Sequence, residues 1–211
     1  MNLKILFSVK SLVVLAIICT MLACEKKSKS KREYNLKSIV EKNLGKKIIL
    51  PDNLKSYSSF PNIIADSLEM SFANYKIYTH INVSCSTCID GIKKWDSLVP
   101  QFIRLRTAVF LICSSEDNFE LIKNIFESNY LEGFSYPIFL DKKNEFVEKN
   151  PFMKESVHFE TVLTDNNNNN IILMGNPIYS EKTKELYFSE ISKKTNSNNI
   201  PKKQFEGLQL K

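Results

Sequence analysis

Hydrophobic residues along this chain follow two spacings, one typical of strands and the other of helices. Tyr75 to Val83 is rich in β-branched and aromatic residues, and Ala108 to Cys113 is a continuous apolar run, so both predict well-covered strands. Between them, side chains recurring at steps of four and three predict one buried helix face: Cys88, Ile92, Trp95, Val99 and Phe102. Pro100 falls inside this pattern and predicts a kink or a restart of the helix.

After the second strand, the pattern predicts a helix and then shorter elements. Ser114 and Ser115 are expected to cap this helix, and its apolar side chains share one face: Phe119, Ile122, Ile125 and Phe126. Tyr136 to Leu140 predicts a strand, with Pro137 at its start, where a missing N–H is tolerated. Phe146 to Lys149 predicts a short helix or turn.

The last third of the chain predicts a hairpin and a helix. Thr161 to Thr164 and Ile171 to Met174 are joined by Asp165 and five asparagines, which suit a loop tip because asparagine tolerates left-handed backbone. Leu186, Tyr187 and Ile191 mark a final helix. From Lys193 onward the periodicity is lost, so this end is expected to fray.

Signals before the first strand are shorter. Asn35 to Asn43 has helical spacing and stops at Gly45, and Lys47 to Leu50 predicts a short strand closed by the turn residues Pro51-Asp52-Asn53. The residues from Ser56 to Glu69 fit no single element. Parallel strand–helix–strand units followed by a hairpin and a terminal helix predict an α/β fold, a three-layer α/β/α sandwich with a central mixed sheet.

Cys85-Ser86-Thr87-Cys88 stands where the first of these strands meets the helical pattern, which begins near Ile89. Two cysteines at this spacing can close a small ring. A cysteine at a helix N-terminus has its thiolate stabilised by unpaired backbone N–H groups and by the helix dipole, so its pKa falls and it becomes nucleophilic. The motif therefore predicts a redox-active pair, with Cys85 at the helix start as the nucleophile and Cys88 as the resolving cysteine.

The N-terminal residues predict export and lipid anchoring. Lys4 and Lys10 lie around an apolar stretch that is too short and too interrupted for the ~20 apolar residues of a membrane span. Met21-Leu22-Ala23-Cys24 resembles a bacterial lipoprotein signal, whose cysteine carries the lipid. We expect a cell-envelope protein, held in a membrane by lipid and facing the periplasm. The expected segments are a signal peptide (1–23), a basic flexible tether (24–36), the folded domain (37–195) and a frayed tail (196–211).

Cysteine usage points to a local redox pair. Of the five cysteines, Cys19 leaves with the signal peptide and Cys24 takes the lipid, so three remain, Cys85, Cys88 and Cys113. One close pair and one odd cysteine do not make a disulfide scaffold. Cys113 lies within an apolar run and is expected to be a small core residue.

Charge is concentrated near the N-terminus. The net charge is +6, but the basic residues before Tyr34 account for most of it, and the remainder of the chain is almost neutral. An almost neutral body gives no indication of nucleic-acid binding. A basic serine- and lysine-rich segment beside a lipid anchor fits a solvated spacer near anionic headgroups.

The order strand, C-x-x-C, long helix, strand, helix, hairpin and terminal helix resembles the thioredoxin fold. With the lipoprotein signal, the chain resembles the TlpA-type, membrane-tethered thiol-disulfide oxidoreductases over about residues 37 to 195. Three segments carry the resemblance: Cys85 to Cys88, Tyr136 to Asp141, and Phe159 to Asp165. The last of these stands where the family has a proline-threonine pair followed by a strand. The resemblance implies thiol-disulfide exchange without a cofactor. Its implied partners are exported proteins bearing disulfides or thiols and a membrane or periplasmic thiol electron donor.

Two positions depart from the family pattern. Phe159 stands in place of the cis-proline that faces the dithiol, and Thr79 stands in place of the buried acid six residues before the first cysteine. Proton transfer would therefore need water, His80 or Glu160. His80 is expected to pack inside the sheet with one nitrogen satisfied. By the same resemblance, His158, Phe159 and Glu160 form a loop that faces the substrate.

Other functions stay open at this point. The two thiols could form a static disulfide, or the fold could serve as a non-enzymatic binding module. Cys85, Cys88 and His158 would also suit copper delivery, because sulfur and imidazole are ligands that copper prefers, although such relatives space their cysteines C-x-x-x-C. Zinc is not indicated, because no second Cys/His pair stands at ligand spacing. Whether the dithiol reduces, oxidises or isomerises is also left open.

Overall fold

The computed structural model describes residues 35–57, 73–84, 86–128, 134 and 136–197, in two units that divide between residues 43 and 44. In the first unit, residues 35–43 form the predicted helix, where Lys37 Nζ lies 3.7 Å from Glu41 Oε1 one turn later. The predicted signal peptide, Cys24, Cys85 and the tail from residue 198 lie outside the described residues. The fold described below belongs to the second unit.

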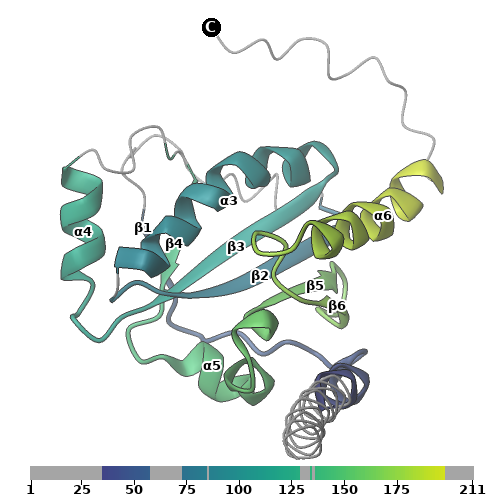
Figure 1. Ribbon diagram of the computed structural model, residues 1–211, viewed down its shortest axis with the longest axis horizontal. Helices are drawn as coiled ribbons and strands as arrows, with labels where there is room; N and C mark the ends of the chain where they lie inside the picture. Colours follow the sequence, from purple (N-terminus) through teal and green to yellow (C-terminus); the bar gives the residue numbers. More distant parts are fainter. Residues whose placement is uncertain (1–34, 58–72, 85, 129–133, 135, 198–211) are drawn as a thin grey trace, which may run out of the picture. The chain divides into compact units, whose positions relative to one another are not determined.

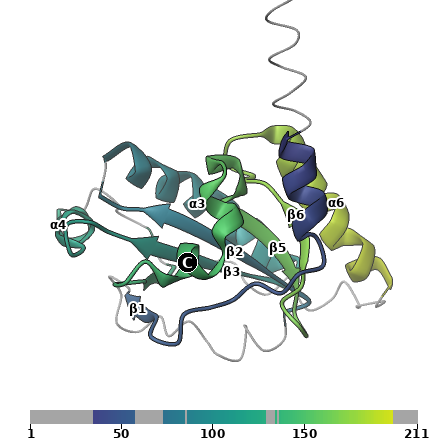
Figure 2. The same ribbon diagram turned by 90° about the horizontal axis from the view of Figure 1, so that it is seen from below.

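The described strands form one mixed sheet in the order β1–β4–β3–β2–β5–β6 (Figures 1 and 2). β2, β3 and β4 run parallel, whereas β1, β5 and β6 are antiparallel to their neighbours. β2 lies between β3 and β5. The bounds are β1 Lys55–Tyr57, β2 Tyr75–Asn82, β3 Thr107–Ser114, β4 Ile138–Leu140, β5 Thr161–Asp165 and β6 Ile171–Met174.

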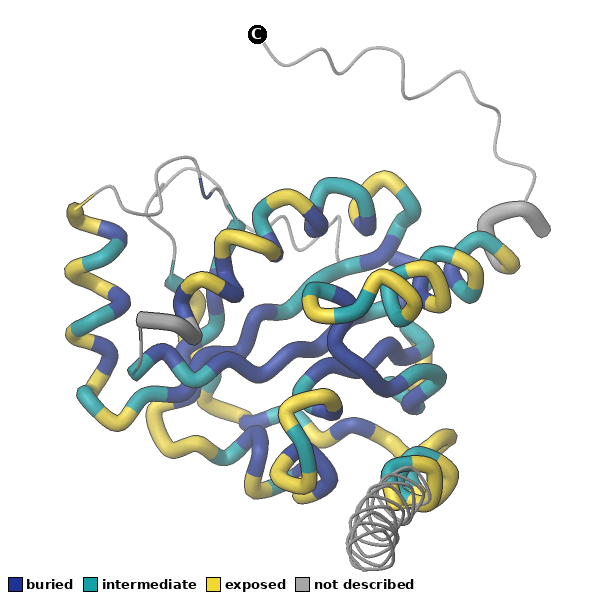
Figure 3. Tube along the Cα trace, in the orientation of Figure 1, coloured by how far each residue is buried: buried dark blue, intermediate teal, exposed yellow. Residues whose placement is uncertain are grey.

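One face of the sheet is covered by α3 (Ser86–Arg104), α4 (Glu120–Glu127) and α6 (Glu181–Ser197) (Figure 1). Their inward side chains and the sheet form a buried core, while their outer sides are exposed (Figure 3). The buried residues of α3 are Ile89, Ile92, Trp95, Leu98, Val99 and Phe102. α3 continues through Pro100 without restarting. Burial of Val99 and Phe102 on either side of the proline favours the helix at a point where one backbone hydrogen bond is lost.

The opposite face is covered by α5 (Glu145–Lys149) and two short 3-10 helices, η1 (Pro151–Lys154) and η2 (Val157–Phe159). α5 begins where it does because the buried Asp141 carboxylate accepts hydrogen bonds from the backbone N–H groups of Glu145 and Phe146. The Asn150 side chain after α5 accepts from the N–H of Ile49 and donates to its carbonyl, which fixes residues 48–50 beside this layer. The predicted three-layer α/β/α sandwich with a central mixed sheet is therefore confirmed.

Several boundaries differ from the sequence-based expectation. Lys47 to Leu50 forms only an isolated bridge, Lys47 with Asn170, and the sequence did not predict β1, which is short and mostly exposed. The predicted final helix is α6, in which Tyr187 and Ile191 are buried and Leu186 is 50% exposed. The α6 helix also extends past Lys193 to Ser197. These are places where few neighbours constrain the hydrophobic pattern, so spacing alone gave the wrong bounds.

Candidate functional site

The C-x-x-C motif lies at a strand-to-helix junction, as the sequence predicts. β2 ends at Asn82 and α3 begins at Ser86, so Cys88 belongs to the first turn of α3. Cys85 itself lies outside the described residues, and it directly precedes the helix in sequence. The junction therefore places the motif at the C-terminal end of a central parallel strand, the edge at which open α/β sheets bind their ligands.

Hydrogen bonds fix the residues that lead into the motif. Val83 N–H donates to the Ser114 carbonyl (2.9 Å), and Ser84 N–H donates to Asn82 Oδ1 (2.9 Å). Ser84 Oγ in turn accepts from Glu116 N–H (2.6 Å). Residues 83 and 84 are thus tied to the end of β3 and the turn after it.

Cys113 is a core residue, as predicted. It lies opposite Ile81 in the β2–β3 register, has no exposed surface and forms no disulfide. Burial raises the pKa of its thiol to about 12. A thiol that stays protonated and inaccessible does not compete with the C-x-x-C pair for disulfide exchange.

The predicted substrate-facing loop is η2 and the residue after it. Ser156 starts the turn by accepting a hydrogen bond from His158 N–H through its hydroxyl (3.2 Å). His158 is exposed and Glu160 half-buried, whereas Phe159 is only 5% exposed. Phe159 therefore contributes to packing, and the two polar residues on either side of it are the ones that reach solvent.

Thr79, at the position where the resembled family has a buried acid, is sealed in the core. It has no exposed surface, and its hydroxyl shares a 2.7 Å hydrogen bond with the hydroxyl of Thr161 on β5. Its neighbours at alternate positions, Ile77 and Ile81, belong to the core beneath α3, so Thr79 points to the same face. This hydroxyl pair satisfies both groups and carries no titratable charge.

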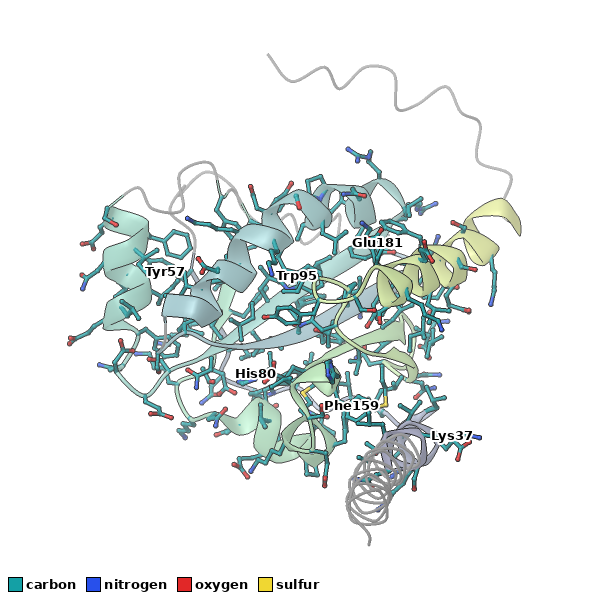
Figure 4. The ribbon with its side chains drawn as sticks, viewed as in Figure 1. Lys37, Tyr57, His80, Trp95, Phe159 and Glu181 are labelled. Carbon is teal, nitrogen blue, oxygen red and sulfur yellow. The ribbon has the colours of Figure 1, made fainter. Side chains whose placement is uncertain are left out.

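His80 points to the other face and joins three segments. Its Nε2 lies 2.7 Å from Ser114 Oγ on β3, and its Nδ1 lies 3.7 Å from Glu160 Oε1. Its backbone N–H also donates to the Glu160 carbonyl (2.8 Å). Figure 4 shows Trp95 on the α3 side of the sheet and His80 and Phe159 on the side of η2. The expectation that His80 packs in the sheet with one satisfied nitrogen is confirmed.

Ser114 and Tyr179 are site residues that sequence reasoning missed. Ser114 and Ser115 were both expected to cap a helix, but β3 extends to Ser114. In the turn before α4, Phe119 N–H donates to the side chains of Ser115 and Asp117. Asp117 has its pKa lowered by hydrogen bonds, foremost that from Ser115.

Tyr179, in the loop before α6, is 53% exposed and lies against α3. A Cβ added to Gly91 would lie 3.5 Å from its hydroxyl oxygen, and Lys94 Nζ lies 5.1 Å from its ring centroid. Burial and, to a smaller degree, the negative charge of Glu160 raise the Tyr179 pKa. Its approach to α3 could not be found from spacing, because the loop meets the helix only in the folded chain.

Within the described residues, no group of three or more His, Cys, Asp or Glu side chains is arranged to hold a metal ion. No helix in that same part of the chain combines the length and apolar character needed to cross a membrane.

Comparisons with known proteins find similar solved structures only. No protein-family model matches the chain, and no curated protein matches it. Solved structures do match. The thioredoxin domain of a thiol-disulfide oxidoreductase from Bacteroides vulgatus is 14% identical, with a TM-score of 0.41 over 68% of this chain and 96% of that one. An uncharacterized thioredoxin-like protein from Porphyromonas gingivalis is 16% identical, with a TM-score of 0.40 over 60% and 79%.

A third similar structure is a candidate thiol:disulfide interchange protein, DsbE, from Chlorobium tepidum. It is 11% identical, with a TM-score of 0.47 over 70% of this chain and 97% of that one. The strand order and the helices on both faces agree with the thioredoxin-like fold that the sequence resemblance predicts.

Proposed function

We propose that this protein exchanges disulfides with exported proteins through Cys85 and Cys88. The thiolate of Cys85 attacks a substrate disulfide, which breaks the bond between the two substrate sulfurs and forms a mixed disulfide. Cys88 then attacks the Cys85 sulfur, closes the Cys85–Cys88 disulfide and releases the second substrate thiol. Two electrons pass from the dithiol to the substrate, and the reverse sequence oxidises a substrate dithiol.

The observation that supports this proposal is the place of the motif in the fold. α3 begins one residue after Cys85, so the unpaired N–H groups of its first turn lie where a thiolate at position 85 gains most. Cys88 lies one turn further in, which suits a resolving cysteine. The remaining thiol of the folded domain, Cys113, is buried and held protonated, so it does not interfere.

Cysteine variants test the proposal. With dithiothreitol as reductant, we expect the wild-type protein to accelerate reduction of insulin disulfides, and Cys85→Ser to abolish the acceleration. Cys88→Ser should retain the first attack only and accumulate mixed disulfides, seen on non-reducing gels. Cys113→Ser is the matched control and should keep the wild-type rate. A wild-type protein without activity, or a Cys85→Ser variant that keeps it, would contradict the proposal.

Location is the second part of the proposal. We propose that lipid on Cys24 holds the protein in a membrane of the cell envelope, with the dithiol facing the periplasm. Support comes from the sequence before Tyr34, a short apolar stretch followed by Leu22-Ala23-Cys24 and a basic spacer. Cells fed a labelled fatty acid should label the wild-type protein and not Cys24→Ser, which should move from the membrane fraction to the soluble fraction. Equal labelling of both would refute the anchor.

A further inference from the structure

The end of the sheet opposite the C-x-x-C motif gathers residues from several segments, and we call it the basal end. β2 begins there at Tyr75, which lies opposite Thr107 at the start of β3 and Asp165 at the end of β5. Asn74 N–H donates to the Arg106 carbonyl (2.7 Å), so the turn from α3 into β3 belongs to the same end. β2 runs from the basal end toward the other end of the sheet, where it meets α3 at the motif, and we call that the motif end (Figure 1).

Two further segments reach the basal end. The first residues of the second unit pair with the start of β6, since Gly45 N–H donates to the Ile171 carbonyl and Ile171 N–H donates to the Lys46 carbonyl (2.8 Å each). The last turns of α6 lie beside the start of β2, where the Tyr75 hydroxyl donates to the Glu190 carbonyl (3.5 Å). The folded unit therefore begins and ends at its basal end.

Charges at the basal end are mostly positive. Among the described residues there, the basic side chains are Lys46, Lys47, Lys76, Arg104, Arg106 and Lys193, and the acidic ones are Asp165 and Glu190. Six positive charges against two negative ones leave a net charge of +4 at this end. Four of the basic side chains are exposed, those of Lys46, Lys47, Arg104 and Lys193.

Contacts within the basal end use only part of this charge. Lys193 Nζ lies 2.5 Å from Glu190 Oε2, which forms an ion pair. Lys76 Nζ donates instead to the Asn166 carbonyl and to Asn169 Oδ1 (3.3 Å each), and neutral partners leave a lysine its charge. The basal end as a whole therefore presents a positive field to solvent.

Among the described residues of the motif end, acidic and basic side chains are mixed. They are Asp90, Lys93, Lys94, Glu116, Asp117, Lys142, Lys143, Glu160 and Glu181. Opposite charges this close together largely cancel beyond a Debye length. The two ends of the domain therefore differ in how strongly an anionic surface attracts them.

Two exposed apolar side chains add to the basal end. Leu44 is the first residue of the second unit, and Ile103 lies in the last turn of α3 beside Arg104. Segments that lie in a membrane interface combine lysine or arginine with aliphatic side chains in this way. The chemistry of the basal end thus fits a layer of lipid headgroups.

We propose that the basal end binds anionic phospholipid headgroups and so turns the motif end, with its dithiol, away from the membrane. This inference rests on the proposed lipid anchor. The chain that leads from Cys24 enters the folded unit at Leu44, so the tether holds a membrane near this end. An anchored domain stays within reach of the headgroups, so attractions that are weak in free solution are enough to orient it. An acidic protein would meet the same charge, but the tether holds a membrane beside it. The orientation leaves the dithiol open to exported proteins.

Acetylation of lysines tests the orientation in the wild-type protein. The full-length protein, purified from membranes, is inserted into preformed vesicles of phosphatidylcholine alone, or of equal parts of phosphatidylcholine and phosphatidylglycerol. N-acetoxysuccinimide then modifies the lysines, and mass spectrometry of peptides gives the rate at each one. We expect Lys46, Lys47 and Lys193 to react about threefold more slowly on the anionic vesicles, because headgroups cover them and favour their charged form. Lys142, exposed at the motif end, should react equally on both. About 0.5 M sodium chloride should remove most of the difference, because it screens the attraction.

Paired variants separate the charge of the basal end from the effect of the tether. Lys46→Gln with Lys47→Gln removes two exposed charges from the basal end, and Lys142→Gln with Lys143→Gln removes two from the motif end. The protection of Lys193 on anionic vesicles should fall by about half or more in the first variant and stay at the wild-type level in the second. Circular dichroism shows whether both variants are folded, which their exposed positions lead us to expect.

Three results would overturn the inference and leave the anchor and disulfide exchange standing. They are equal rates at Lys46 and Lys47 on the two kinds of vesicle, an equal fall in rate at Lys142, and equal protection of Lys193 in the two paired variants. A wild-type protein that carries no lipid would overturn the anchor and the inference together.

Discussion

Thr79 and His80 are both buried, on opposite faces of β2, yet their surroundings differ in chemistry. Under α3, Thr79 meets another hydroxyl and forms a neutral pair with Thr161. On the side of η2, His80 meets a hydroxyl and a carboxylate, Ser114 and Glu160. Successive residues of a strand point to opposite faces, so neighbours in sequence enter unrelated environments. The comparison shows that one strand carries a neutral hydroxyl pair on one face and a histidine beside a carboxylate on the other.

The largest effect is expected in the core of the α3 face. Phe102 has no exposed surface and contacts the rings of Trp95 and Phe188. Phe102→Ala should lower the free energy of unfolding by about 3–5 kcal/mol, because it leaves a cavity. Urea denaturation followed by circular dichroism measures the change. Its neighbour Ile103 is 38% exposed and is the control; Ile103→Ala should lose less than about 1 kcal/mol. Equal losses would mean that α3 presents another face to the sheet.

The next largest effect is expected when the hydrogen bond between Thr79 and Thr161 on the α3 face is broken. Thr79→Val leaves the buried Thr161 hydroxyl without a partner, so it should lower the free energy of unfolding by about 1–3 kcal/mol. Adding Thr161→Val should recover most of this loss, since no polar group then remains unpaired. For both variants, the change in the free energy of unfolding should be the same at pH 5.5 and pH 8. A double variant no more stable than Thr79→Val alone would show that the hydroxyls do not depend on each other.

The corresponding change on the η2 face removes the hydroxyl partner of the buried His80 ring. Ser114→Ala leaves His80 Nε2 without the hydroxyl that lies 2.7 Å from it. The loss of unfolding free energy should be about 1 kcal/mol, because a buried ring nitrogen then lacks its partner. Urea denaturation of wild type and variant measures it. A variant as stable as the wild type would show that the Ser114 hydroxyl does not support the ring.

The smallest effect near neutral pH is expected at Cys113. Burial raises its pKa to about 12, above the ~8.5 of a free thiol, so stability is fully present below about pH 8.5 and falls as the pH rises toward 12. In a variant with the other four cysteines replaced by serine, iodoacetamide at pH 8.5 should modify Cys113 only after urea unfolds the protein. Mass spectrometry detects the added group. Modification of the folded protein at the rate of the unfolded chain would show that β3 does not enclose the thiol.

The sequence predicted the long, periodic elements. β2 and β3 follow from runs of β-branched and apolar residues, α3 from apolar side chains three and four residues apart, and the hairpin from two short apolar runs around an asparagine loop. Its errors lie where the elements are short or where a partner is distant. β1 is three residues long, and Ser114 could serve equally as a helix cap or as the last residue of a strand.

The features of the candidate site also differ in how far the sequence could predict them. The place of the C-x-x-C motif at a strand-to-helix junction could be predicted, because it depends on residues adjacent in the chain. The hydrogen bond of His80 to Ser114 and the approach of Tyr179 to Gly91 join residues far apart in sequence. No local pattern encodes those contacts.

By itself, the sequence determined the order of strands and helices, the junction that carries the two cysteines and the burial of Cys113, because local spacing and side-chain hydrophobicity decide these features. Only the tertiary structure decided that Thr79 is closed off by Thr161 while His80 is joined to Ser114 and Glu160. The strand register brings these residues together, and register is set by the packing of the whole sheet rather than by any one segment.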